Sequence, residues 1–104
     1  MGFKIIWSQF DEYQIDIIFN YYANNIDVKI ARSITFQIRD KVSELYSNPY
    51  IGQKEEFLSD RPEDYRYCLV KNYKIIYSVN EDLQIIKITD VFDTRQNPIK
   101  LKRN

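Results

Sequence analysis

The sequence predicts an α+β fold in which an antiparallel helical hairpin covers a four-stranded antiparallel sheet. Two observations predict this class. The C-terminal third holds three apolar runs separated by breaks of two and three residues, which is typical of neighbouring strands. The first half holds two stretches whose apolar residues recur at helical spacing, behind one short apolar run. A chain of 104 residues is expected to form one domain, spanning 1–104.

The three C-terminal runs are residues 65–70, 73–79 and 83–92, all rich in β-branched and aromatic side chains. Lys71-Asn72 separates the first two runs, and Asn80-Glu81-Asp82 separates the last two. A parallel pair of strands needs a crossover of a dozen or more residues, so breaks this short indicate antiparallel neighbours. The sequence therefore predicts a three-stranded meander.

The N-terminal part predicts a strand followed by a helix. Residues 3–7 are apolar and are expected to pair with one edge of the meander as a fourth strand. Ser8 is expected to cap a helix over residues 10–24, with Asp11 completing a capping box. The apolar residues of this helix form two stripes, Phe10-Tyr13-Ile17-Tyr21 and Ile15-Ile18-Phe19-Tyr22. Two stripes indicate that one side packs inside the domain and the other meets a partner.

The second predicted helix has a single apolar face. Asp27 is expected to cap it, and Pro49 is expected to end it near Ser47. The apolar face consists of Ala31, Ile34, Ile38, Val42 and Leu45. Because the break between the helices is short, they are expected to form an antiparallel hairpin. Residues 48–52 predict a turn, and residues 54–64 predict a solvated acidic loop.

Composition excludes several kinds of site. The chain has no histidine, two glycines and one cysteine, Cys68. A Ser-His-Asp site, a histidine-bound metal, a glycine-rich phosphate loop and an intrachain disulfide are therefore not possible. No cofactor and no metal are expected. No apolar run approaches the ~20 residues of a membrane span, and no signal peptide is evident, so a cytoplasmic protein without a membrane partner is expected.

Charge is divided unevenly along the chain, although the net charge is zero. Residues 1–64 hold 7 basic and 11 acidic side chains, and residues 65–104 hold 8 basic and 4 acidic ones. The basic sheet half suits a phosphate backbone or an acidic protein. The alternative interpretation is that this split arises by chance.

Three cations in the meander are candidate catalytic residues. Arg66, Lys74 and Arg95 lie one per strand or strand end, beside several tyrosines. Cleavage of RNA by its own 2′-hydroxyl needs a base, an acid and cations that stabilise the developing charge, and Tyr, Lys and Arg supply them. The alternative is that the tyrosines pack in the core while the cations are solvated.

The chain resembles the RelE/ParE superfamily, the toxins of bacterial type II toxin–antitoxin pairs. The resemblance lies in FKIIW before a capped helix, Tyr21-Tyr22-Ala23, Asn48-Pro49-Tyr50-Ile51-Gly52, and most specifically in the segments YKIIYSV (73–79) and VFDTRQNP (91–98). It implies the same fold and a toxin that inhibits bacterial growth. RelE-like members are ribosome-dependent endonucleases that cut mRNA, and ParE-like members poison DNA gyrase.

The departures from the RelE-like pattern favour the ParE-like branch. Lys74 stands where RelE-like members have an arginine, and Cys68 stands at an expected basic position. Arg66 and Arg95 match, but no Tyr or His follows Arg95. Gyrase poisoning is therefore the first hypothesis. A metal-independent RelE-like mRNA endonuclease using Arg66, Lys74 and Arg95 is the alternative, and an inactive relative or small interaction module is the third.

The resemblance also implies a cognate antitoxin that wraps the toxin with an extended or helical segment. The expected contacts are Tyr13, Tyr21 and Tyr22 on the first helix and Lys100, Lys102 and Arg103 in the basic tail, and the alternative is that the three tyrosines pack inside the domain. The other expected partner is gyrase or the translating ribosome with mRNA, and no small-molecule substrate is expected. Arg95 is expected at the open surface after the last strand, near Lys74 or Arg66.

Overall fold

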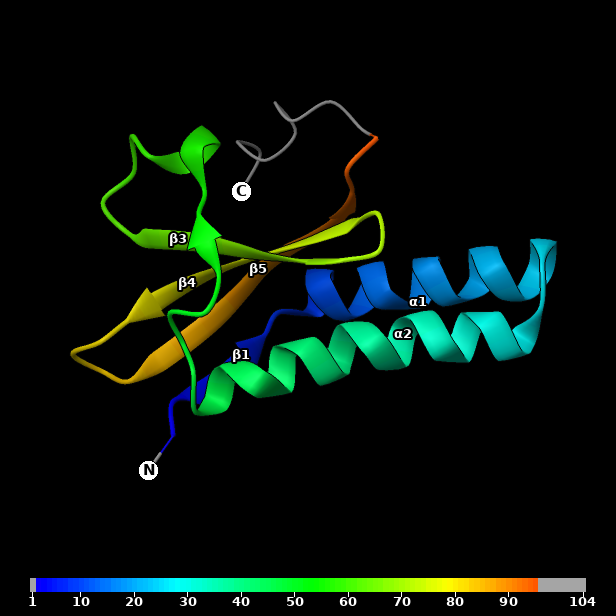
Figure 1. The fold of residues 1–104 in the computed structure, drawn as a ribbon, viewed down its shortest axis with the longest axis horizontal. Helices are drawn as coiled ribbons and strands as arrows, with labels where there is room; N and C mark the ends of the chain where they lie inside the picture. The colour runs from blue at the N-terminus through cyan, green and yellow to red at the C-terminus, as the bar shows by residue number, and fades with distance from the viewer. Residues whose placement is uncertain (1, 96–104) are drawn as a thin grey trace.

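The computed structural model of the chain describes residues 2–95 and places two long helices against one sheet (Figure 1). The elements are β1 (Lys4–Trp7), α1 (Gln9–Asn25), α2 (Val28–Ser43), β2 (Gln53–Lys54), β3 (Asp64–Val70), β4 (Tyr73–Asn80) and β5 (Ile85–Asp93). Two short 3₁₀ turns, η1 (Glu44–Tyr46) and η2 (Glu56–Leu58), follow α2 and β2. The α+β class is confirmed. Within residues 2–95, no helix combines the length and the apolar character needed to cross a membrane.

The sheet differs from the expected one in two details. It has five strands in the order β1-β5-β4-β3-β2, and β1 runs parallel to β5 while every other pair is antiparallel. The expectation of a purely antiparallel sheet is therefore wrong for β1. A break of two residues forces neighbouring strands to run antiparallel. The connection from β1 to its partner β5 instead includes both helices, and a connection that long permits parallel pairing. The fifth strand, β2, is too short to give a sequence signal.

Both helices begin at the residues that their caps predict. The Ser8 hydroxyl accepts the Asp11 N–H at 3.0 Å, and the Asp11 carboxylate accepts the Ser8 N–H at 3.4 Å, so the capping box is complete. Asp27 accepts the Lys29 N–H at 2.6 Å at the start of α2. Asp11 is fully buried, and this burial raises the pKa of its carboxyl group.

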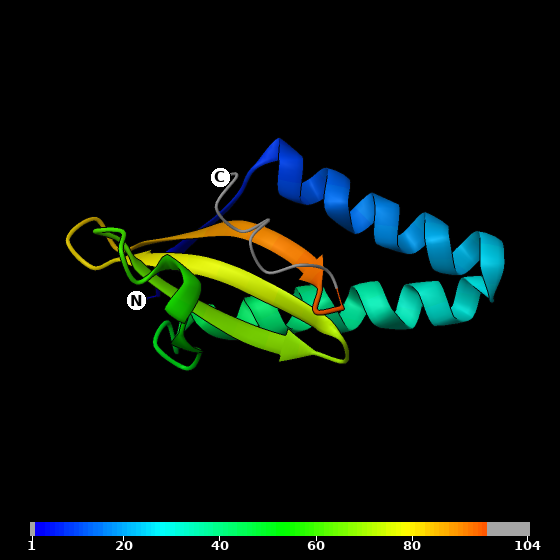
Figure 2. The same cartoon turned by 90° about the horizontal axis from the view of Figure 1, so that it is seen from above.

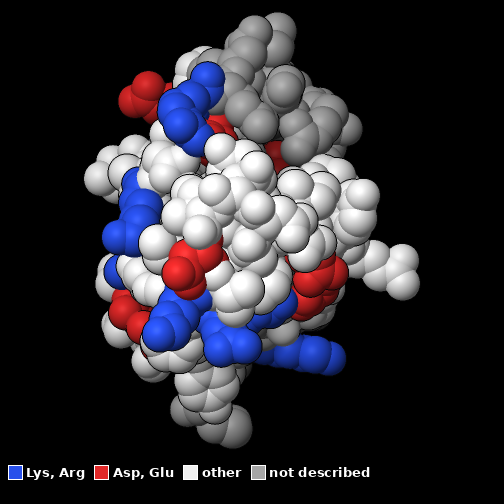
Figure 3. All heavy atoms as spheres, turned by 90° about the vertical axis from the view of Figure 1, so that its right-hand side faces the viewer, with Lys and Arg blue, Asp and Glu red and all other residues white. Residues whose placement is uncertain are grey.

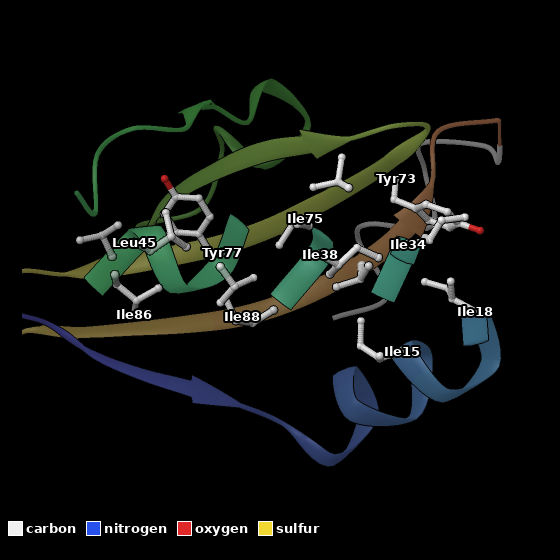
Figure 4. Packing of buried hydrophobic residues seen from close by; sticks show 14 residues of the cluster. Ile15, Ile18, Ile34, Ile38, Leu45, Tyr73, Ile75, Tyr77, Ile86 and Ile88 are labelled. Atoms are coloured by element: carbon white, nitrogen blue, oxygen red, sulfur yellow. The ribbon is translucent and has the colours of Figure 1, made fainter. Parts of the chain in front are cut away.

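The main core lies between the sheet and the helical hairpin (Figures 2 and 4). Its buried side chains come from α1 (Ile15, Ile18), α2 (Ile34, Ile38, Val42), η1 (Leu45), β3 (Val70), β4 (Tyr73, Ile75, Tyr77, Val79) and β5 (Ile86, Ile88, Val91). Side chains alternate between the faces of a strand, so Lys74 and Ile76 of β4 point away from the helices.

A β-bulge in β5 sets which side chains reach each face. Tyr77 pairs with Ile88 and Ile76 with Asp90, so Thr89 is the extra residue on β5. The bulge lets Ile88 and Val91 both face the helices. Asp90 and Phe92 turn instead to the open face of the sheet, the face away from the helices.

Candidate functional site

The open face of the sheet carries one buried ion pair. The Lys74 ammonium lies 2.7 Å from a carboxylate oxygen of Glu55 and 4.1 Å from the centre of the Tyr67 ring. The Glu55 side chain is 1% exposed and that of Lys74 is 16% exposed. Lys74 is therefore both neutralised and covered, and its charge is directed into the protein.

The segment after β2 holds Glu55 in this position. Glu55 also accepts the Phe57 N–H at 3.1 Å, which starts η2, and Leu58 then packs on Ile76 and Phe92. This segment crosses the open face of the sheet and covers part of it. The expectation that residues 54–64 form a solvated loop is thus wrong for Glu55 and Leu58. Burial of the apolar Leu58 side chain holds this segment, and with it Glu55, against the sheet.

Arg66 lies on the opposite face of the sheet from Lys74. Its register partner is Tyr77, whose side chain is part of the main core, whereas the register partner of Lys74 is Leu69. The Arg66 guanidinium donates to the Gly52 carbonyl at 3.0 Å, lies 5.0 Å from the Tyr50 ring centre and pairs with Asp64 at 3.3 Å. Arg66 therefore stabilises the turn before β2.

The same turn is held from inside by Tyr77. Its buried hydroxyl donates to the Pro49 carbonyl and accepts the Gly52 N–H, both at 2.9 Å. Desolvation raises the pKa of the Tyr77 hydroxyl to about 12. A Cβ on Gly52 would lie 2.5 Å from that hydroxyl, so only glycine fits this position. The Asn-Pro-x-x-Gly motif is thus a turn built around one tyrosine.

Arg95 is exposed just past the end of β5. Its side chain is 72% exposed, and its Nε donates to both carboxylate oxygens of Asp93 at 2.9 Å. Asp93 is also the register partner of Tyr73, so the Arg95–Asp93 ion pair lies beside the helix-facing side of the sheet. The Arg95 guanidinium holds the pKa of the Asp93 carboxyl well below its usual range.

The three candidate catalytic cations are consequently not brought together. Lys74 is on the open face, and Arg66 and Arg95 are on the other side of the sheet. Arg66 lies level with Tyr77 and Arg95 lies near Tyr73, four residues along β4, which is roughly 13 Å. Each cation has its own acidic partner: Asp64 for Arg66, Glu55 for Lys74 and Asp93 for Arg95.

The predicted partner-binding tyrosines divide into two environments. Tyr13 and Tyr21 are 62% and 54% exposed on α1. Tyr22 instead packs against the core, with its hydroxyl 3.4 Å from that of Tyr73, and the Tyr21 and Tyr22 rings meet edge to face. The other three predicted contacts, Lys100, Lys102 and Arg103, lie outside the described residues.

The hairpin reaches past the end of the sheet, as Figures 1 and 2 both show. Viewed from that end, the middle of the surface is largely without charged side chains, and most Lys, Arg, Asp and Glu lie toward its edges (Figure 3). Exposed apolar residues near the tip are Tyr21, Ile26, Val28 and Ile30, and Ile17 is exposed at the middle of α1. An exposed apolar surface of this kind is typical of a protein–protein contact.

A pocket of about 270 Å³ opens between α1 and the end of β5. Its lining is formed by Gln14, Ile17, Ile18, Tyr21, Tyr73, Val91, Phe92, Asp93 and Arg95. Sequence reasoning missed this pocket and the burial of Glu55, because both depend on contacts between distant segments. Across residues 2–95, no cluster of acidic or cysteine side chains is suited to hold a metal ion.

Comparison with known proteins identifies the family to which the chain is similar. The family model of the ParE toxin of the type II toxin–antitoxin system parDE matches residues 5–98. No curated protein matches the chain.

Two solved structures show the same fold. A chain of the chromosomal ParDE toxin–antitoxin system from P. aeruginosa is 17% identical, with a TM-score of 0.71 over 88% of this chain and 96% of that one. A mutant of the E. coli toxin RelE in the free state is 12% identical, with a TM-score of 0.67 over 99% of this chain and 93% of that one. The family match covers most of the sequence. The chain therefore belongs to the ParE toxin family of type II toxin–antitoxin systems, and this membership implies an antitoxin as its protein partner.

Proposed function

We propose that this chain is a ParE-like toxin that inhibits growth in the cytoplasm by poisoning DNA gyrase. The toxin acts by binding, without a metal or cofactor, and an antitoxin neutralises it. The ParE family match over residues 5–98 supports the toxin assignment. The choice of gyrase rests on the arrangement of the three cations.

The pairing of Lys74 with Glu55 carries this choice. A RelE-like nuclease needs its cations on one accessible surface, because they stabilise charge on the same phosphate. Here Lys74 is bound to a buried carboxylate under the segment after β2, on the face opposite to Arg66. Arg66 is paired with Asp64, and Arg95 lies roughly 13 Å from Arg66 along the sheet, so these two cations do not converge on one phosphate either. This geometry supports action by binding rather than RNA cleavage.

The RelE-like mRNA endonuclease remains the second candidate, and one observation favours it. The fold matches that of the free E. coli toxin RelE over 99% of this chain. A nuclease would require the segment around Glu55 to leave the sheet and expose Lys74.

Purified components test the proposal. The protein is added to purified bacterial gyrase with relaxed plasmid and ATP, and supercoiling and trapped cleaved DNA are followed on gels. In parallel, it is added to translating ribosomes, and the mRNA is analysed for cuts. Gyrase inhibition with intact mRNA is expected.

The control is a Lys74→Met and Glu55→Gln double variant, which removes the paired charges together. A gyrase poison that does not use Lys74 should keep its gyrase inhibition in this variant. Cleavage of mRNA by the wild type that disappears in the double variant would contradict the proposal and favour the nuclease.

A further inference from the structure

The pocket between α1 and the end of β5 has the features of an anchor site for a carboxylate with an aliphatic stem. Its walls include the apolar side chains of Ile17, Ile18 and Val91, and only Asp93 and Arg95 carry charge. Ile17 and Tyr21 at its entrance are 44% and 54% exposed. An apolar pocket with a small number of placed polar groups is the usual form of a binding site.

Arg95 has donors left for a second acid. It uses Nε and Nη2 for Asp93, and within residues 2–95 no acceptor meets its Nη1. A guanidinium has five donors in a planar fork, so one edge can hold Asp93 while the other faces a ligand. The pairing with Asp93 fixes the guanidinium at the rim of the pocket before any ligand arrives.

A second cation lies on the same end of the sheet. The Thr94 N–H donates to the Asn72 carbonyl at 2.8 Å, which ties the turn before Arg95 to the turn that holds Lys71. Lys71 is exposed. Arg95 and Asp93, the one acid in the pocket lining, balance each other in charge, so Lys71 is the charge left over among these three residues. The rim therefore favours an anionic ligand.

We propose that this pocket anchors an acidic, amphipathic segment of the antitoxin, with one leucine-like side chain between α1 and β5 and one carboxylate on Arg95. The inference rests on the toxin–antitoxin part of the proposed function and gives it a specific point of attachment. It also assigns Arg95 to protein recognition instead of phosphate chemistry.

The site can be probed with a fragment that combines both features. Isotope-labelled protein is titrated with 4-methylpentanoate and, separately, with the neutral 4-methylpentanamide, and amide and guanidinium signals are followed by NMR. The carboxylate should shift the signals of Ile17, Val91 and Arg95 in a saturable way. The amide should bind about 1.5-fold to fivefold more weakly, the range expected for an exposed ion pair.

Three variants sharpen the result. Arg95→Gln should remove the preference for the carboxylate, and Ile17→Ser should weaken both probes alike. Arg32→Gln, an exposed arginine of α2 outside the pocket, should change nothing. Equal affinity for the two probes, no saturable shift, or shifts centred elsewhere would overturn the proposal. The titration needs no gyrase, so its failure and a failed gyrase assay are separate results.

Discussion

The ammonium of Lys74 and the carboxylate of Glu55 meet at 2.7 Å on the sheet face that the helices leave open. The two residues are far apart in sequence, and the segment that brings Glu55 to Lys74 also packs Leu58 onto Ile76 and Phe92. The segment that carries Glu55 thus covers part of this face, and the Lys74–Glu55 contact makes the Lys74 ammonium unavailable there.

Glu55→Gln should destabilise the protein by about 2–3 kcal/mol, because it leaves the Lys74 ammonium poorly solvated and without its counter-ion. Urea unfolding measures the change. The Lys74→Met and Glu55→Gln double variant should recover much of the loss. Lys54→Gln removes an exposed ion pair with Asp64 and should cost no more than about 1 kcal/mol. A loss for Glu55→Gln as small as that of this control would show that the buried pair is not structural.

Tyr77→Phe should cost about 1–3 kcal/mol, since it leaves the Gly52 N–H and the Pro49 carbonyl buried without their partner. Thermal unfolding provides the measurement. Tyr46→Phe changes a side chain that is 55% exposed and should alter stability by less than about 0.5 kcal/mol. Similar melting temperatures for the two variants would contradict the role given to the Tyr77 hydroxyl.

The raised pKa of Tyr77 predicts a loss of stability in alkali. Its pKa is about 12 in the folded protein and near 10.0 when unperturbed, so the folded state disfavours the phenolate. The stabilisation is complete below pH 10 and falls as the pH rises from about 10 to about 12. The Tyr77→Phe variant lacks this titration and should lose less stability over that interval. Parallel curves for the two proteins would contradict the pKa shift.

Gly52→Ala should destabilise the protein by about 1–3 kcal/mol through crowding. The added Cβ would lie 2.5 Å from the Tyr77 hydroxyl and 2.6 Å from the Tyr67 carbonyl, and the carbonyl belongs to a strand that cannot easily move. Gly2→Ala is the matched control, because the atoms nearest its Cβ belong to the exposed ring of Tyr46, a side chain that can move aside. Chemical unfolding that gives equal midpoints for the two variants would rule out this steric account.

The local parts of the fold were predictable from sequence because local chemistry determines them. Ser8 and Asp27 cap the helices, and the two-residue turn at Lys71-Asn72 joins β3 to β4. The direction of β1 was not predictable, since its connection to the sheet is long enough for either orientation. The bulge at Thr89 left no sequence signal either.

The candidate site was less accessible to sequence reasoning, although one signal was present. A two-residue turn pairs Val70 with Tyr73, which sets Arg66 opposite Tyr77 and Lys74 opposite Leu69. Two residues on opposite faces cannot act on one phosphate, so the turn itself argued against a shared Arg66–Lys74 site. Burial of Glu55, by contrast, follows from packing between segments that are distant in sequence.

The most direct test of the central claim is expression of the protein in bacteria under tight control, with plasmid supercoiling and mRNA integrity followed in the same cells. A ParE-like toxin that poisons gyrase should alter plasmid supercoiling while transcripts stay intact during the early phase of growth arrest. Early cleavage of transcripts with unchanged supercoiling would contradict this account and assign the chain to mRNA cleavage.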